Sequence, residues 1–277
     1  MCKGGGFIKQ LLTPIKIGSL ELKNRIVMAP TSMGLPWEEK REYLGRIADG
    51  GAALIYLGDM GVEPPIFSVD CSLFTPEGRE HLASIVDRIH RGGAKVGAQL
   101  YLWDYDMAQL CQMIRQGCSR SERESFKKDH VDEYVTQMPL ERIQEILDHF
   151  EQAASVVETL GFDMIQVLGG HILNSFSSGY LNHREDAYGG DTKRRAQFAS
   201  QVVRAVGRGA PDLPIEYKLS VHDDSIPCGD GAPDISEMEI FVPELEAAGV
   251  DAFQAAFSNR QNIMDTVPAK NHPTFQG

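Results

Sequence analysis

Short apolar runs, rich in β-branched side chains, alternate along this chain with longer segments of helical period. Parallel strands must be joined by crossover connections, usually helices, so this alternation is typical of a parallel sheet. The six runs that we expect to be strands are residues 25–29, 53–57, 95–100, 163–168, 215–219 and 251–255. At 277 residues the chain has the length of one α/β barrel, which is about 250 residues. We therefore predict an α/β fold with a single domain over residues 1–277.

Two of the intervening segments carry clear helix signals. After Pro139, apolar residues recur at three- and four-residue steps as far as Gly161, which favours a helix with one buried face. A second helix is expected to begin at Thr75, which is a good N-cap followed by Pro76, and to end at Gly92.

A polar stretch over residues 101–137 interrupts this pattern directly after the third expected strand. It is too long for a routine connection between a strand and a helix. We interpret it as an excursion loop or lid over the functional end of the sheet.

Composition excludes several classes of function. The formal net charge of -12 argues against a nucleic-acid partner, because neutralising phosphates requires a basic surface. No apolar run is long enough for a membrane span. The five cysteines are odd in number and lack the close pairs of a zinc or iron–sulfur site, so we expect no metal and a reducing, cytoplasmic location.

Two motifs carry a resemblance to a known family. Residues 14–30 read PIKIGSLELKNRIVMAP, and residues 182–190 read NHREDAYGG. Both resemble stretches of the old yellow enzyme or NADH:flavin oxidoreductase family, and the resemblance extends over residues 12–259. The first motif indicates a short hairpin followed by a buried strand that ends at Pro30. The second indicates a loop held rigid by pairing between its arginines and Asp186, with a tight turn at the two glycines.

The resemblance implies a fold, a cofactor and a reaction. The fold would be a (β/α)8 TIM barrel with FMN bound at its C-terminal rim. The chain would be an ene-reductase-like oxidoreductase that passes hydride from NADH or NADPH through the flavin to an α,β-unsaturated carbonyl substrate, a small enone or enoate.

The same resemblance implies the residues that would bind the flavin. Residues expected against the isoalloxazine ring are Ala29, Pro30, Thr31 and Ser32, and Gly58 is expected beside them at the rim. Gln99 would read the pyrimidine edge, and Lys218 would supply a cation near N1 and O2. The family has arginine where Lys218 stands, and a buried lysine could instead pair with an acid such as Asp223. Side chains expected together at the rim are Ser32, Gly58, Gln99, His171, Lys218 and Ser258.

The substrate-binding positions fit the family less well. Its two donors to the substrate carbonyl would fall at Leu168 and His171, and its proton-donating tyrosine at Leu173. His171 is therefore the one candidate catalytic residue, and a role as an ordinary rim hydrogen-bonder stays open. Tyrosines that could supply a proton from another direction are Tyr101, Tyr105 and Tyr180.

The recognisable βα units stop near Ala256, so we expect about six of the eight units of a barrel in this chain. An open sheet edge favours a homo-oligomer or a partner chain that completes the barrel. The alternative function is non-catalytic, a truncated barrel acting as a subunit or scaffold. A flavin-free barrel enzyme with Lys218 as a Schiff-base lysine is a third, weaker hypothesis.

Overall fold

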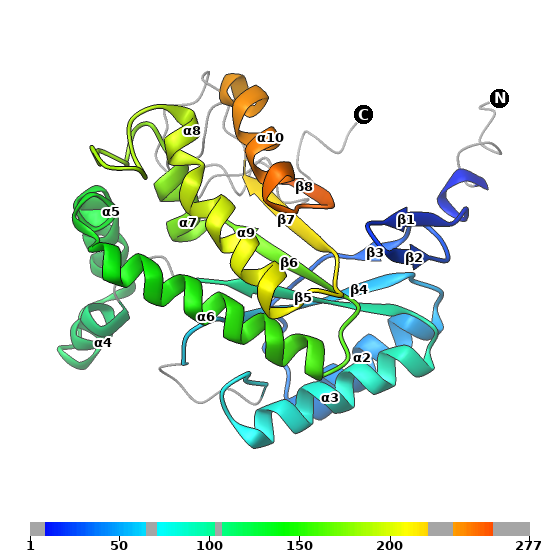
Figure 1. Cartoon of the computed structure of the whole chain (residues 1–277). Helices are drawn as coiled ribbons and strands as arrows, with labels where there is room; N and C mark the ends of the chain where they lie inside the picture. Colours follow the sequence, from blue (N-terminus) through cyan, green and yellow to red (C-terminus); the bar gives the residue numbers. More distant parts are fainter. Residues whose placement is uncertain (1–8, 65–70, 103–106, 221–234, 257–277) are drawn as a thin grey trace, which may run out of the picture.

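The computed structural model describes residues 9–64, 71–102, 107–220 and 235–256. Its main feature is a six-stranded sheet in which every pair of neighbours is parallel and the strands follow their order in the chain (Figure 1). The strands are β3 (Val27–Met28), β4 (Leu54–Gly61), β5 (Lys95–Tyr101), β6 (Met164–Gly169), β7 (Ile215–Ser220) and β8 (Ala252–Ala256). All six predicted strands are confirmed. A doubly wound sheet would reverse its strand order at a switch point, whereas a sheet that keeps chain order throughout is the pattern of a barrel.

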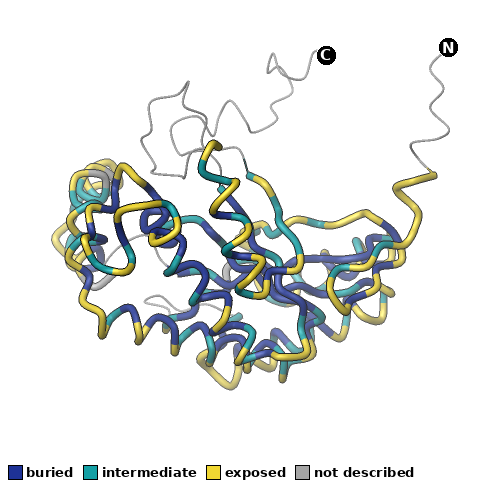
Figure 2. The backbone as a smooth tube through the Cα atoms, turned by 45° about the horizontal axis from the view of Figure 1, so that its top comes forward, coloured by how far each residue is buried: buried dark blue, intermediate teal, exposed yellow. Residues whose placement is uncertain are grey.

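Helices pack against one face of this sheet, where each is joined to the strands before and after it (Figure 1). They are α2 (Trp37–Asp49), α3 (Pro76–Arg91), α6 (Leu140–Thr159), α9 (Gln197–Gly209) and α10 (Met238–Ala248). Both predicted helices are confirmed, since α3 is capped by the Thr75 side chain and α6 follows Pro139. Figure 2 shows the consequence, with burial concentrated along the strands and exposure on the outer sides of the helices.

Successive side chains along each strand point to opposite faces of the sheet, so they contribute to two separate hydrophobic cores. Val96, Ala98 and Leu100 of β5 belong to the large core that the helices complete. Residues between them face the other side, which would be the interior of a barrel. At its lower end this interior is apolar, because Tyr56 and Met164 pack there with the hairpin of β1 (Ile15–Ile17) and β2 (Leu20–Leu22). The predicted hairpin floor is confirmed. The strand after it was expected to be buried, and this is wrong: Val27 is exposed and Met28 half-buried, because β3 lies at an open edge of the described sheet.

The stretch after β5 does not form the loop that its polar sequence led us to expect. Within it lie α4 (Met107–Arg115) and α5 (Arg120–Gln137), which Figure 1 shows at the end of the molecule where α6 begins. Ser119 caps α5 through a capping box with Glu122. The helix has charged residues on most of its surface, so its apolar period is too weak to see. The stretch is still an excursion between β5 and α6, and its action as a lid stays a prediction.

The described chain also contains three short elements after β6: α7 (His171–Ser177), α8 (Thr192–Arg195) and a 3₁₀ turn, η1 (Ile235–Glu237). None of the helices within the described ranges combines the length and the apolar character that a membrane crossing requires.

Candidate active site

A layer of polar side chains lies above the apolar floor of the sheet's interior face. Gln99 on β5, Gln166 on β6 and Glu216 on β7 stand opposite one another in the strand register. One layer nearer the carboxyl ends, Lys218 stands opposite Gln254 on β8. Because strand residues two apart share a face, Lys218 lies on the same face as Glu216 and therefore as Gln99. The sheet thus brings the two predicted flavin-edge residues to one side.

Hydrogen bonds join this layer into a continuous network. The Gln99 amide nitrogen donates to Gln166 Oε1 at 2.6 Å. The Gln166 amide nitrogen in turn donates to the Glu216 carboxylate and, at 2.8 Å, to Gln254 Oε1. Gln166 has no exposed surface, so the network satisfies an amide that would otherwise be costly to bury.

The Glu216 carboxylate acts on two neighbouring groups, the Tyr56 hydroxyl and the Lys218 ammonium. Burial and the neighbouring Glu216 both raise the pKa of Tyr56, whose hydroxyl therefore stays neutral and able to donate. Burial lowers the pKa of the Lys218 ammonium, while the negative charge of Glu216 opposes that shift. Glu216 is thus the acid whose charge acts on Lys218, and Asp223, the acid proposed from sequence, lies outside the described residues.

The chain just after β3 lies close to Gly58 of β4. A Cβ atom added at Gly58 would lie 3.3 Å from the backbone nitrogen of Thr31 and 3.5 Å from the side chain of Pro30. The absent side chain therefore lets the two strand ends come together. Ala29, Thr31 and Ser32 are exposed there, and Pro30 is half-buried. These residues form a shelf at the rim, and their contact with a flavin ring stays a prediction.

His171 begins α7 in a strained position. Its φ is 56°, in the left-handed region that non-glycine residues rarely adopt, and such residues concentrate at functional sites. Burial, with a smaller contribution from the charge of Lys127 on α5, lowers its pKa from 6.5 to about 4. The imidazole is therefore neutral near pH 7, and it can donate a hydrogen bond but holds no spare proton to release.

The structure separates the three tyrosine candidates. The Tyr101 ring lies at the rim end of β5 with its centroid 6.2 Å from that of His171. Tyr180 is 66% exposed and points to solvent, and Tyr105 lies outside the described residues, as does Ser258. Leu173, at the family's tyrosine position, is fully buried in the helix-side core. Tyr101 is thus the candidate that accompanies His171.

The loop that follows α7 has the structural role predicted for it. Arg184 binds both oxygens of Asp186, at 3.0 and 2.5 Å. It also donates to the carbonyl oxygens of Val135 and Met138, at 2.9 and 2.7 Å, which ties this loop to the end of α5. Gly190 takes a φ of 89° in the expected turn.

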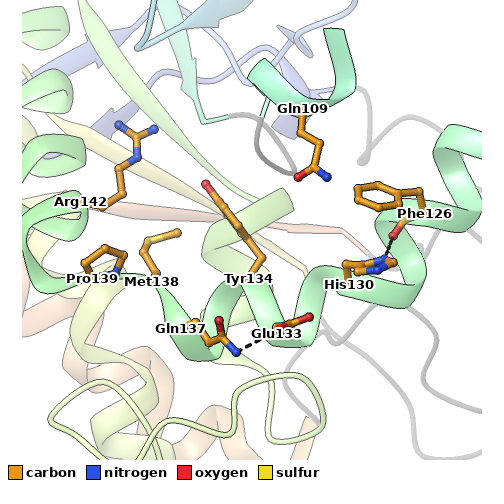
Figure 3. Close-up of a pocket in the computed structure, with 9 residues that line it drawn as sticks. All are labelled: Gln109, Phe126, His130, Glu133, Tyr134, Gln137, Met138, Pro139 and Arg142. Carbon is orange, nitrogen blue, oxygen red and sulfur yellow. Dashed lines mark hydrogen bonds between the residues drawn. The ribbon is translucent and has the colours of Figure 1, made fainter. Parts of the chain in front are cut away.

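A cavity of about 380 Å³ lies in the excursion, and its lining includes none of the predicted rim residues (Figure 3). Its lining comes from α4, α5 and the start of α6: Gln109, Phe126, His130, Glu133, Tyr134, Gln137, Met138, Pro139 and Arg142. Phe126 stacks on His130 with ring centroids 4.2 Å apart. Arg142 is already paired with Glu63 and Glu145, so its charge is compensated. The sequence could not indicate this cavity once residues 101–137 were interpreted as a loop.

Sequence reasoning also missed Gln166, Glu216 and Gln254. The available signal was their position, since each polar residue alternates with apolar neighbours along its strand. Together with Gln99 and Lys218 they form a polar set of three amides, one carboxylate and one ammonium, beside a shelf that Gly58 keeps narrow. An isoalloxazine ring requires amide partners at its pyrimidine edge and a cation near N1, so these residues fit FMN.

Comparisons with known proteins agree with this geometry. The family model described as NADH:flavin oxidoreductase / NADH oxidase family matches residues 10–274. The chain is 39% identical over 269 residues to a bilirubin reductase of Clostridium symbiosum, which covers 95% of this chain and 72% of that protein. A cinnamate reductase of Clostridium sporogenes is 30% identical over 277 residues, covering 88% of this chain and 40% of that protein.

Solved structures add the fold. An old yellow enzyme from Pichia sp. AKU4542 matches with a TM-score of 0.69 and 21% identity, over 93% of this chain and 74% of that one. At this identity the likeness establishes the architecture alone. It confirms the predicted TIM-barrel fold, of which the described sheet is the six-stranded part.

Proposed function

The chain belongs to the NADH:flavin oxidoreductase / NADH oxidase family, whose members are FMN- and NAD(P)H-using oxidoreductases, and we propose that it reduces a conjugated carbon–carbon double bond of a small molecule. The observation that carries this proposal is the convergence of Gln99 and Lys218 on one interior face, with His171 at the rim above them.

FMN, when bound, supplies two-electron transfer from NADH or NADPH to the β-carbon of an α,β-unsaturated carbonyl. Gln99 would hold the pyrimidine edge of the flavin through its amide. Lys218 would place a positive charge where the ring gathers negative charge on reduction. The shelf of Ala29, Thr31 and Ser32 would support the ring from one side.

His171 and Tyr101 would have different roles, His171 in polarising the substrate carbonyl and Tyr101 in supplying a proton. A neutral imidazole can polarise the carbonyl by donating an N–H without transferring its proton. The proton for the α-carbon would then come from another group, and the Tyr101 hydroxyl is the candidate, because its ring lies beside that of His171. Leu168, half-buried on β6 where the family has a second donor, would leave His171 as the sole donor to the carbonyl from this segment.

The names of two relatives support the class of bond reduced. Bilirubin and cinnamate, the substrates named in those relatives, both contain conjugated double bonds. We propose substrates of this class, with bilirubin the first to test because its reductase is the more similar of the two proteins.

The test has two stages. First, the purified protein is titrated with FMN, and flavin bands that remain after desalting support the proposal. Second, the loaded protein is assayed anaerobically with NADH and NADPH against bilirubin, cinnamate and 2-cyclohexenone. A protein that binds no FMN and oxidises neither nicotinamide would contradict the proposal and favour the scaffold hypothesis.

A pair of variants tests the flavin edge. Gln99→Leu should weaken FMN binding by about 5- to 150-fold, because a buried pyrimidine edge would lose its partner at roughly 1–3 kcal/mol. Gln152→Leu, on an exposed position of α6, is the matched control and should leave the affinity unchanged. Equal affinities in the two variants would remove Gln99 from the site.

A further inference from the structure

Glu216 is an acidic residue inside the barrel that neither the sequence motifs nor the proposed reaction accounts for. Its carboxylate accepts a hydrogen bond from Gln166 and lies against the Tyr56 hydroxyl. It is not in the top layer, because Lys218 stands one layer nearer the rim on the same strand. It therefore influences a ligand at the rim through its neighbours.

A carboxylate imposes a direction on the amides bonded to it. Ionised glutamate has acceptor atoms only, whereas a glutamine side chain presents an acceptor on one side and two donors on the other. Gln166 must therefore turn its NH2 group toward Glu216, which leaves its Oε1 facing Gln99.

The orientation of the Gln166 amide in turn fixes the orientation of the Gln99 amide. Since Gln166 Oε1 can only accept, Gln99 must turn its own NH2 group toward Gln166, as the 2.6 Å bond shows. The Gln99 carbonyl oxygen is then free to face the other way. The second N–H of Gln166 does not reverse this order, because it donates to Gln254 Oε1.

We propose that Glu216 is a positioning residue that fixes the orientation of the Gln99 amide through Gln166. This rests on the proposed binding of FMN at Gln99. The pyrimidine edge of a flavin carries one imide N–H, at N3, between two carbonyl oxygens, so it requires an acceptor opposite N3. The order set by Glu216 presents the Gln99 oxygen for that purpose. In a network of glutamines alone the opposite order is equally well bonded, and it would place NH2 against N3–H.

The experiment compares FMN with 3-methyl-FMN, which lacks the N3–H donor, and records the ratio of their dissociation constants by quenching of flavin fluorescence. Wild-type protein should prefer FMN by about tenfold or more, the size expected for one hydrogen bond plus steric exclusion of the methyl group. In Glu216→Gln the preference should fall by about three- to tenfold, because the amide order is no longer imposed.

A double variant that exchanges the residues at positions 166 and 216 distinguishes an effect of amide orientation from an effect of lost charge. In Glu216→Gln combined with Gln166→Glu, the carboxylate at position 166 still forces Gln99 to present its NH2 group. The preference for FMN should therefore return to within about twofold of wild type. Gln166→Leu, which keeps Glu216 but breaks the connection, should lose the preference as Glu216→Gln does.

The results that would overturn the inference are distinct. If Glu216→Gln weakens FMN and 3-methyl-FMN equally, Glu216 acts through charge or packing and not through amide order. If Gln166→Leu keeps the wild-type preference, Gln166 does not connect the two residues. Wild-type protein that binds neither flavin would instead refute the proposed function, and this inference with it. Thermal melts of each variant establish that the fold is intact before binding is compared.

Discussion

His171 should make the protein less stable in mild acid, and the structure gives the size of the effect. Burial and the charge of Lys127 lower the pKa of the imidazole to about 4 in the folded protein, against 6.5 for the ordinary group. Between those values the unfolded chain binds a proton that the folded chain does not. Folding stability from this residue is therefore complete above pH 6.5 and is lost as the pH falls toward 4.

The magnitude follows from the two pKa values. At pH 4.5 the unfolded histidine is almost fully protonated and the folded one is mostly neutral, so the linkage relation gives a loss of about 2.5 kcal/mol relative to pH 7.5. That is a sizeable fraction of the roughly 5–15 kcal/mol that stabilises a typical domain.

The assay is urea unfolding, followed by circular dichroism at pH 7.5 and 4.5, for wild type and His171→Asn. Asparagine has no group that titrates in this range and tolerates the left-handed backbone at this position, so the substitution removes the titration without adding strain. The drop in unfolding free energy on acidification should be about 2.5 kcal/mol smaller in His171→Asn than in wild type.

His183→Asn, at an exposed histidine, is the control and should leave the drop as it is in wild type. Other acids contribute equally to every variant and cancel in the comparison. The same drop in wild type and His171→Asn would refute the reasoning, because His171 would then titrate alike in the folded and unfolded chains.

Four further substitutions test the fold around the site. Gly97→Ala should lower the unfolding free energy by about 1–3 kcal/mol, because its Cβ would overlap the Tyr56 ring. Gly207→Ala should raise it by about 0.5–1 kcal/mol in the same urea titration, because its Cβ would make an ordinary contact with the Ile215 side chain, 3.7 Å away, within a helix. Asp163→Asn should cost about 1.5–3 kcal/mol, measured by thermal unfolding, because this carboxylate accepts bonds of 2.7 to 2.8 Å from His90, Lys95 and the Val96 backbone. Arg184→Gln should raise hydrogen exchange and proteolysis within residues 182–190, since it removes the bidentate pair and leaves buried carbonyls unsatisfied; unchanged protection would show that other contacts hold the loop.

The strands and their order could be predicted because both signals are local. Each strand is a short run made up mainly of apolar residues, all but β8 include a β-branched residue, and a sheet built from βα units pairs consecutive strands. The excursion could not be predicted from periodicity, because charged residues are spread around α5 and, of its residues whose burial is described, Val135 alone is fully buried. The capping box of Ser119 and Glu122 was a local signal that could have placed the start of α5.

The same distinction between local and long-range signals applies to the residues of the candidate site. Gln99 and Lys218 were recognised by resemblance, and their common face follows from counting residues along each strand. The network around Gln166 was not accessible, because it depends on the register between strands that are 67 and 50 residues apart in sequence. A single polar residue on a buried strand carries no information about its partner until the neighbouring strand is in place.

The polarity of the sheet's interior face increases from its floor to its rim, and this increase affects where a ligand can bind. At the floor, Tyr56 and Met164 close the barrel with apolar packing, and a Cβ at Gly97 would already collide there. Above it, Gln166 uses both sides of its amide on protein partners, so the group of that layer that can still bind a ligand is the carbonyl oxygen of Gln99, which is an acceptor. At the rim, burial lowers the pKa of Lys218, which means that the ammonium pays a desolvation cost for its position. A negatively charged or electron-rich group bound above Lys218 would offset that cost, and the two lower layers would offer it no comparable site.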